Sequence, residues 1–235
     1  MTDAWDEPTG IAARGTVIVA AGRGETADAY GRFGRRIAAD GYRVRVLPDV
    51  SADVEASIAA AGKLLVDDSL PGPKVVVGSD TGALFARKLA ERQAPGLDAI
   101  ILAGLPVAAA RPPITLPGWD DELEARTACP THRGVLGNGA VQPGALFSAP
   151  IPTELIGNAG YRGTLPTLAL HGDSDPVSPL DTARDSYPVA PVVIVGGRHD
   201  VLNDITHRSV AATIILFLER LRLGADLPEI VRAPA

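Results

Sequence analysis

The segment Gly78–Gly82 (GSDTG) places Asp80 at the centre of a short turn, with a glycine two residues away on each side. An apolar run that predicts a strand, Lys74–Val77, precedes the turn, and a helical pattern, Ala83–Arg92, follows it. Small flanking residues permit the cramped strand-to-helix turn of a nucleophile elbow, which pushes its central side chain outward. Asp80 is therefore a candidate nucleophile; the alternative is an aspartate that only caps the following helix.

Two further polar segments follow the last two predicted strands, and they read HGDSDPVSP (171–179) and GGRHDVLND (196–204). A neutral imidazole is an effective base near pH 7, and a neighbouring carboxylate fixes its tautomer and stabilises the imidazolium. We expect Asp175 and His199 to form this pair. Three other carboxylates are alternative acids, or residues that hold turns and helix caps: Asp173, Asp200 and Asp204.

A glycine-rich turn with the pattern Gly-x-Gly-x-x-Ala runs from Gly22 to Ala27, directly after the predicted strand Thr16–Ala20. In dinucleotide-binding proteins such a turn brings backbone amides to a pyrophosphate, and Asp49, after the next strand, would then bind a ribose. The same turn could instead present its amides to a different anion. From the turn alone, both interpretations remain open.

The order nucleophile, acid and histidine along the chain resembles that of the α/β-hydrolase fold, and the resemblance extends over residues of about 15 to 222. The segment 171–179 is similar to the acid loop of this superfamily, which implies that Asp175 is the acid. The segment 196–204 is similar to the histidine loop of lysophospholipase and monoacylglycerol lipase relatives.

The resemblance also implies an oxyanion hole made of two backbone amides, those of Arg23 and Thr81. In that case the glycine-rich turn serves the oxyanion hole and not a dinucleotide. The His-Gly opening of the family is replaced by Ala21 and Gly22, so only the backbone role is carried over.

Aspartate occupies the elbow position where esterases, lipases and thioesterases of this fold carry serine. A carboxylate that attacks an ester gives a mixed anhydride, whereas attack on an sp³ carbon gives an alkyl ester that His-activated water can hydrolyse. This arrangement resembles that of epoxide hydrolases and dehalogenases. The expected function is hydrolysis of a small organic electrophile, with Asp80, Asp175 and His199 as catalytic residues. The halide-binding Trp after the nucleophile is replaced by Thr81, and the cap-like segment offers only Tyr161 as a tyrosine donor.

Two other functions remain open. One is a carboxylic-ester or lysophospholipid hydrolase in which Asp80 is a general base, and the other is a ligand-binding member of the fold without chemistry.

Four further residues are candidates for the missing hydrogen-bond donor to the leaving group: Arg23, Arg111, His132 and Trp119. The remaining histidines, His132, His171 and His207, show no ligand-like spacing, so we expect surface or structural roles for them, and neither a metal nor a cofactor is expected. Cys129 lacks an elbow of its own and is expected to pack in the cap-like segment.

Short apolar runs that alternate with helical patterns predict a minimal, mostly parallel sheet of about six strands with helices on both faces. The expected strands are Thr16–Ala20, Arg43–Leu47, Lys74–Val77, Ala99–Leu102, Thr167–His171 and Val192–Val195. Besides Ala83–Arg92, helical patterns cover Thr26–Asp40, Ala52–Leu65, Trp119–Ala128 and a last helix from near Asp204 to just before Gly224. The alternation fails between 105 and 164, which we interpret as a short cap-like insertion.

The composition agrees with a single domain over residues 1–235. Hydrophobic residues make up 46% and aromatic residues only 4%, so the core must consist mainly of Ala, Val, Ile and Leu. The net charge of −6 and the lack of a basic run argue against nucleic acid as a partner. No apolar run is long enough for membrane insertion, and no secretory signal is visible, so we expect a cytoplasmic protein that acts on a small-molecule substrate.

Overall fold

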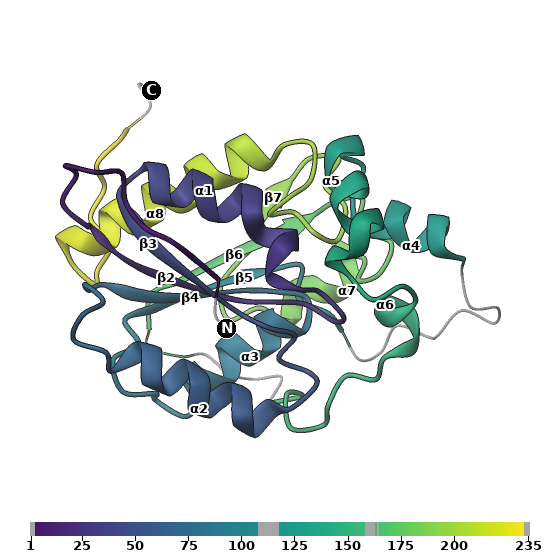
Figure 1. Cartoon of the computed structure of the whole chain (residues 1–235), viewed down its shortest axis with the longest axis horizontal. Helices are drawn as coiled ribbons and strands as arrows, with labels where there is room; N and C mark the ends of the chain where they lie inside the picture. The colour runs from purple at the N-terminus through teal and green to yellow at the C-terminus, as the bar shows by residue number, and fades with distance from the viewer. Residues whose placement is uncertain (1–2, 108–117, 158–162, 164, 233–235) are drawn as a thin grey trace.

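The computed structural model describes residues 3–107, 118–157, 163 and 165–232, and it is built around a seven-stranded sheet (Figure 1). The strands are β1 (Asp3–Trp5), β2 (Gly15–Ala20), β3 (Tyr42–Leu47), β4 (Lys74–Ser79), β5 (Ala99–Ala103), β6 (Thr167–Gly172) and β7 (Val192–Ile194). Their order in the sheet is β1-β3-β2-β4-β5-β6-β7. All neighbours are parallel except β1, which pairs antiparallel with β3.

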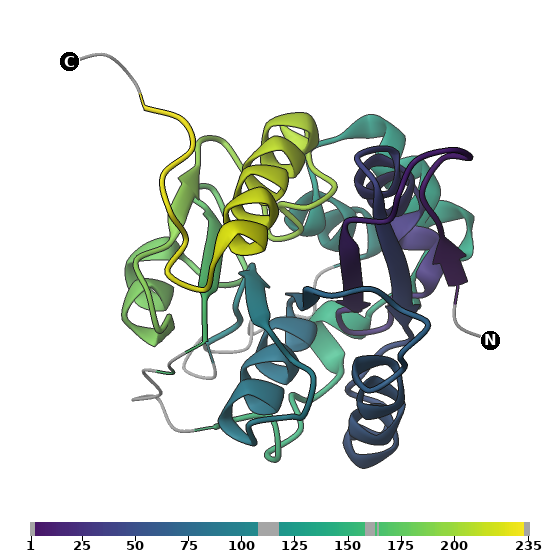
Figure 2. The same cartoon turned by 90° about the vertical axis from the view of Figure 1, so that its left-hand side faces the viewer.

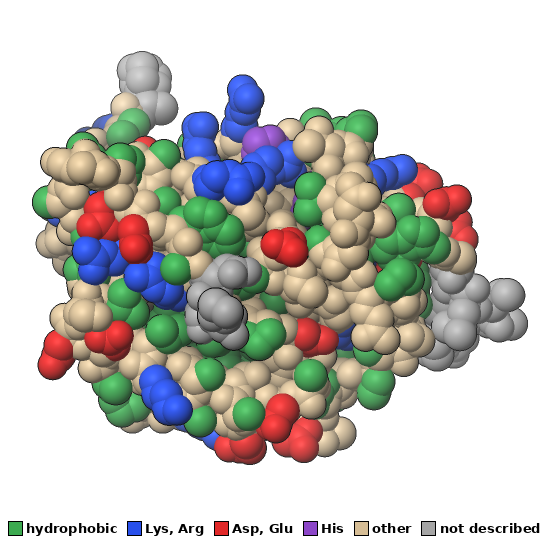
Figure 3. All heavy atoms as spheres, in the orientation of Figure 1, with side chains coloured by type: hydrophobic (Ala, Val, Ile, Leu, Met, Phe, Trp, Pro, Cys, Tyr) green, Lys and Arg blue, Asp and Glu red, His purple; other side chains and the backbone are tan. Residues whose placement is uncertain are grey.

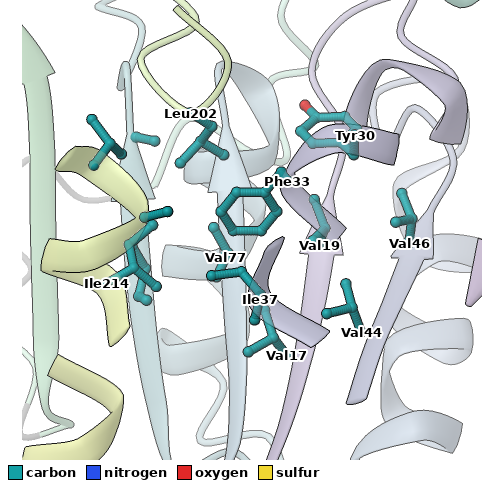
Figure 4. Packing of buried hydrophobic residues seen from close by; sticks show 14 of the residues in the cluster. Val17, Val19, Tyr30, Phe33, Ile37, Val44, Val46, Val77, Leu202 and Ile214 are labelled. Carbon is teal, nitrogen blue, oxygen red and sulfur yellow. The ribbon is translucent and has the colours of Figure 1, made fainter. Parts of the chain in front are cut away.

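Helices cover both faces of this sheet (Figures 1 and 2). The helical elements between β2 and β5 are η1 (Ala27–Tyr30), α1 (Gly31–Ala39), α2 (Val54–Leu65) and α3 (Thr81–Glu91), and α8 (His207–Leu223) follows β7. Helices α1 and α8 pack on one face, where Phe33, Ile37 and Ile214 lie over Val17 and Val77 (Figure 4). Helices α2 and α3 pack on the other face around a second cluster that contains Ile18, Leu65 and Phe85.

The central strands are apolar on both faces because helices bury both. Every residue of β2, β4 and β5 is buried, which explains why these strands appear in the sequence as continuous apolar runs rather than as alternating patterns. The six predicted parallel strands and the predicted helices are confirmed, with boundaries that shift by one to three residues. The first predicted helix begins as the 3-10 turn η1 before α1.

One strand was not expected from the sequence. β1 contains only three residues, and it pairs with the exposed edge of β3. Trp5 of this strand packs against Gly34 of α1, where an added Cβ would lie 2.2 Å from the indole ring. The sheet therefore has a short antiparallel edge strand in addition to the six predicted ones.

The described part of the insertion between β5 and β6 is helical. It contains α4 (Trp119–Arg126), α5 (Pro130–Val135), the π-helix η2 (Leu136–Ala140) and α6 (Ala145–Ser148). These helices gather beside the carboxyl ends of the strands, at the right of Figure 1. Two smaller elements, α7 (Leu180–Ala183) and η3 (Arg184–Ser186), lie between β6 and β7. Among the described residues, no helix is long and apolar enough to cross a membrane.

Both acidic and basic side chains occur on the face of the molecule that Figure 3 shows. This agrees with the modest net charge of the chain.

The turn between β4 and α3 requires its two glycines. An added Cβ at Gly78 would lie 1.9 Å from the carbonyl oxygen of Gly82, and one at Gly82 would lie 2.0 Å from that of Ala20. Both contacts involve backbone atoms, which cannot rotate away. The small-x-Asp-x-small pattern is therefore explained by the close approach of α3 to β2 and β4.

We expect Gly82→Ala to lower the free energy of unfolding by about 3 kcal/mol or more, because the methyl group must displace the backbone of β2. Chemical denaturation measures this change. Gly62→Ala in α2 is the matched control, since its Cβ would meet nothing within 4 Å, and alanine should stabilise that helix by about 0.5–1 kcal/mol. Equal effects of the two substitutions would contradict the packing argument.

Candidate active site

Asp80 is held in a strained backbone conformation at the tip of the turn between β4 and α3. Its φ of 52° and ψ of −122° lie outside the regions that ordinary residues favour. Its amide donates to the carbonyl of Ala103 at 3.2 Å, which ties the turn to the neighbouring strand β5. Strain of this kind concentrates at functional sites, where the surrounding structure enforces it.

Asp80, Asp175 and His199 come together at the carboxyl ends of three parallel strands, β4, β6 and β7. His199 Nε2 lies 3.2 Å from Asp80 Oδ1, and His199 Nδ1 lies 2.7 Å from Asp175 Oδ2. The other oxygen of Asp175 accepts hydrogen bonds from the amides of Val177 and Ser178, at 2.8 and 3.0 Å. The imidazole is thus oriented by one fixed carboxylate toward the other.

Gly104 lets the histidine loop approach the sheet. It has a φ of 55°, and an added Cβ would lie 2.3 Å from the carbonyl oxygen of His199. The loop is also held from the cap side, because the amides of His199 and Asp200 donate to the carbonyls of Ala125 and Arg126 at the end of α4.

Arg23 binds Asp80 through both its side chain and its backbone. Its Nε and Nη2 donate to Oδ2 and Oδ1, each at 2.8 Å, and its amide donates to Oδ2 at 3.0 Å. With His199, four donors therefore surround a carboxylate that offers about four lone-pair sites. The pair is buried, with Arg23 7% and Asp80 2% exposed. The carboxylate is fully hydrogen-bonded in this state.

The electrostatics of the site favour charged forms. Burial raises the pKa of Asp80, but the charge of Arg23 and the hydrogen bonds from His199 and Arg23 outweigh it and hold the pKa well below its usual value. Burial lowers the pKa of His199, but the charge and hydrogen bond of Asp175, together with those of Asp80, raise it overall to about 10. The imidazole is consequently protonated at neutral pH while Asp80 is ionised.

The glycine-rich turn has no amide free for a phosphate among its first residues. Gly22 donates to Glu25 and Tyr30, Arg23 to Asp80, and Gly24 to Asp49 at 2.7 Å. The next two amides donate to backbone carbonyls. Asp49 also accepts from the amide and hydroxyl of Ser51, so it holds the turn in place. This hydrogen bonding contradicts the dinucleotide interpretation of the motif.

The two amides expected to form an oxyanion hole differ in their present partners. The Arg23 amide already donates to Asp80 Oδ2. Within the described residues, the Thr81 amide has no hydrogen-bond partner, as expected for the first residue of a helix. The hydroxyl of Thr81 is buried and also unpaired there.

A buried ion network that the sequence analysis missed lies behind Arg23. Arg126 of α4 donates to Glu25 at 2.8 Å, to Glu122 at 2.8 Å, and to the carbonyl of Arg23 at 2.9 Å. Glu122 also accepts from the amides of Gly144 and Leu146. The spacing of Glu122 and Arg126 on one helix was the only local signal of this network. It fixes the turn that carries Arg23 against the cap-like segment.

His171 is a second histidine beside the acid. It is fully buried, its Nε2 lies 3.4 Å from Asp175 Oδ2 and 2.7 Å from the carbonyl of Ser178, and its Nδ1 lies 2.6 Å from the hydroxyl of Tyr187. Burial lowers its pKa despite the charge of Asp175. A neutral His171 therefore supports the acid loop, in agreement with the expected structural role.

The other predicted polar residues have structural partners. His132 is buried and not at the surface; its Nε2 lies 2.8 Å from Asp200 Oδ2. Asp204 accepts from Thr127, Ala128 and Arg198. Asp173, in contrast, is exposed and accepts from the amide of Gly196 and the hydroxyl of Ser174. None of these three alternative carboxylates contacts His199 through its side chain.

The remaining candidates do not add a donor at Asp80. Cys129 is buried near Arg32, whose guanidinium lies 3.4 Å from the thiol, and Trp119 packs against the core from the start of α4. Arg111 and Tyr161 lie outside the described residues. Within the described ranges, no cluster of three or more His, Cys, Asp or Glu side chains is arranged to hold a metal ion.

Comparison with solved structures places this arrangement in a known fold, whereas comparison with protein-family models and with curated proteins gives no match. A monoacylglycerol lipase from Paleococcus ferrophilus is similar with a TM-score of 0.73 and 14% identity, over 93% of this chain and 98% of that one. A soluble variant of monoglyceride lipase from Saccharomyces cerevisiae has a TM-score of 0.68 and 15% identity, over 93% and 90%.

A lipase-esterase related protein from Clostridium acetobutylicum gives a TM-score of 0.70 at 10% identity, over 92% of this chain and 98% of that one. At such low identity the likeness concerns the fold and not the substrate. The strand order, the strained turn at Asp80 and the positions of Asp175 and His199 agree with it. This chain has the α/β-hydrolase fold.

Proposed function

We propose that the protein is a hydrolase that attacks an sp³ carbon of a small organic substrate with Asp80 and forms a covalent alkyl ester. The observation that supports this proposal most is the chain of contacts from Asp175 through His199 to an aspartate at the elbow. Asp175 and His199 then serve the second step, in which water hydrolyses the ester.

In the first step, Asp80 Oδ1 forms a bond to the substrate carbon, and the leaving group departs with the electron pair of the broken bond. Oδ1 is suited to this role because its donors are both side chains, Arg23 Nη2 and His199 Nε2, which can move away. Oδ2 is held by the Arg23 amide and is suited to become the carbonyl oxygen of the ester.

The charge of Asp80 controls the protonation of His199. While Asp80 is ionised, it helps to keep the pKa of His199 at about 10. Alkylation neutralises Asp80 and removes this contribution, so the pKa of His199 falls and the imidazole can lose its proton to solvent or to the leaving alkoxide of an opened epoxide. The resulting neutral imidazole then takes a proton from water as the water attacks Cγ.

The tetrahedral intermediate places negative charge on Oδ2. The amide of Arg23, which already donates to Oδ2, and the unpaired amide of Thr81 are the proposed donors to this oxyanion. When the intermediate collapses, the bond between Cγ and Oδ1 breaks, and protonated His199 gives the proton that it took from water to Oδ1. The product alcohol leaves with Oδ1, and Asp80 keeps the oxygen of the water.

Arg23 is proposed to stabilise the leaving anion of the first step. A guanidinium carries five N–H bonds, and Arg23 uses its Nε and one N–H of Nη2 on Asp80, with Nη1 directed at the carbonyl of Ala149 at 3.4 Å. The second N–H of Nη2 has no partner in the described structure. This donor would take the place of the Trp and Tyr donors that the sequence lacks.

The full hydrogen bonding of Asp80 also supports a second candidate, a ligand-binding protein without chemistry. A carboxylate that accepts from four donors and has a strongly lowered pKa is a weak nucleophile until Arg23 or His199 moves. The two candidates differ in whether Asp80 is ever alkylated.

Single-turnover reaction in ¹⁸O water tests the covalent route. We expect one labelled oxygen in the peptide that contains Asp80, detected by mass spectrometry, because water attacks Cγ and not the substrate carbon. Panels of epoxides and alkyl halides supply the substrate, and short acyl esters test the ester-hydrolase alternative. Turnover without label in Asp80 would overturn the proposal, and a ligand that raises the melting temperature without any turnover would favour the second candidate.

Arg23→Gln tests the role of the guanidinium. We expect kcat to fall by about 10²-fold, because the leaving anion loses a buried donor, while Arg23→Lys keeps more activity. The acidic limb of the kcat/KM profile should move to higher pH in Arg23→Gln, since the charge of Arg23 lowers the pKa of Asp80. Arg92→Gln, at the far end of α3, removes the same charge and serves as control. An unshifted acidic limb would contradict this role.

The raised pKa of His199 predicts a pH-dependent stability. The folded pKa of about 10 exceeds the usual value of 6.5, so protonated His199 stabilises the fold fully below about pH 6.5, and this contribution disappears as the pH rises toward 10. Urea denaturation between pH 6 and 10 should therefore show a steeper loss of stability in the native protein than in His199→Gln. Parallel profiles would show that His199 does not titrate in this range.

A further inference from the structure

A cavity of about 900 Å³ lies on the side of the glycine-rich turn that faces α2. Its walls come from the end of β3 and the residues after it, from the first turns of α2, from the start of η1 and from residues 139–142. Asp80, Asp175 and His199 do not line it. The cavity is therefore separate from the candidate active site, although Gly24 of the turn forms part of its wall.

The lining of this cavity is apolar and acidic. Its apolar wall includes Val46, Leu47 and Val141, and its carboxylates include Asp49 and Asp53, while no Lys or Arg contributes to it. Neither Asp49 nor Asp53 has a salt-bridge partner among the described residues. Two carboxylates without a salt-bridge partner thus line one cavity to whose wall no Lys or Arg contributes. Asp53 is exposed, and Asp49 interacts at longer range with the charge of Arg23.

Both carboxylates retain the capacity to accept another donor. Asp53 uses Oδ1 to cap α2 through the amide of Ala56, and its Oδ2 has no partner in the described structure. Asp49 accepts from Gly24 with Oδ2 and from Ser51 with Oδ1, so Oδ2 can accept one more hydrogen bond. An ammonium group, which has three donors and no acceptor, matches these acceptors.

Ser57 supplies an independent observation. It lines the cavity from α2, one turn after Asp53, and is only 8% exposed. Its hydroxyl makes no hydrogen bond within the part of the chain that the structure describes, and its oxygen is not one of the buried oxygens without a partner, so it remains accessible. A polar group of a ligand in the cavity can therefore form a hydrogen bond with this hydroxyl.

We infer that this cavity binds an organic cation, with a primary ammonium group against Asp49 and Asp53 and an apolar chain along Val46, Leu47 and Val141. The charge of the two carboxylates selects a cation, and the apolar wall selects one with a hydrocarbon body. This inference does not depend on the chemistry proposed for Asp80.

The position of the cavity connects it to the active site. Asp49, which would receive the ammonium group, also holds the amide of Gly24, and Gly24 directly follows Arg23. A ligand that binds Asp49 and shifts its carboxylate would therefore also shift the glycine-rich turn, which carries Arg23, the partner of Asp80.

Isothermal titration with hexylammonium and with hexan-1-ol tests the inference, because these probes share an apolar chain and differ in charge. We expect hexylammonium to bind the native protein at least about fivefold more tightly, and its binding to weaken as salt is added. Equal binding of the two probes, or no binding of hexylammonium, would overturn the inference.

Variants locate the site. Asp53→Asn keeps a side chain that caps α2 equally well but removes the charge, so we expect hexylammonium binding to weaken by about fivefold with an unchanged melting temperature. Glu55→Gln removes the same charge from the first turn of the same helix, where the side chain pairs with Arg92 outside the cavity, and should leave binding unchanged. Ser57→Ala should also weaken binding.

Equal effects of Asp53→Asn and Glu55→Gln would show that hexylammonium responds only to the general surface charge, which would overturn the assignment to this cavity. Because the titration with the native protein needs no variant and no substrate, its result stands whether or not Asp80 proves to be a nucleophile.

Discussion

The buried ion pair between Arg23 and Asp80 is the interaction on which the site depends. An ionised carboxylate at 2% exposure is tolerated only because a guanidinium and an imidazole supply charge and hydrogen bonds together. The same pairing has two opposite effects on chemistry. It guarantees that Asp80 is ionised at all ordinary pH values, and it reduces the reactivity of the carboxylate until a donor leaves. The aspartate at this position thus determines the electrostatics of the whole site.

Arg23 is held in place by residues distant in the sequence. Arg126 binds the carbonyl of Arg23 and pairs with Glu25 and Glu122, so three charged side chains and one carbonyl are paired in a buried volume. Removal of Arg126 would leave two buried carboxylates without an ion-pair partner, which is far more destabilising than the loss of an exposed ion pair. The position of the turn is therefore determined by the cap-like segment as much as by the sheet.

Much of the fold could be predicted because its signals are local. The strands around Val17, Val76 and Ile100 are apolar on both faces, and Gly78, Gly82 and Gly104 mark the places where loops approach the backbone. Asp80, Asp175 and His199 follow strands that the pattern identifies, so their meeting at one edge of the sheet follows from the topology. β1 could not be predicted, since three residues at an edge carry no periodic pattern.

Arg23 was a donor candidate, but the pairing of its side chain with Asp80 and the network of Arg126 could not be predicted, for a different reason. These contacts join residues 57 and 103 positions apart in the chain, and nothing local distinguishes a buried arginine from an exposed one. For the glycine-rich turn, the sequence pattern instead suggested a function that the structure does not support. Its pattern matches a phosphate-binding loop, but its amides are already bound to Asp80, Asp49 and Glu25, which a linear motif cannot reveal.

The last turn of α4 contacts both the histidine loop and the glycine-rich turn that carries Arg23. Its carbonyls accept hydrogen bonds from the amides of His199 and Asp200, and the side chain of Arg126 donates to the carbonyl of Arg23. The helix therefore fixes His199 and Arg23 relative to each other, so that neither can move independently. The rest of the insertion can vary in sequence and length without disturbing this pair, provided that this one turn of helix keeps its place.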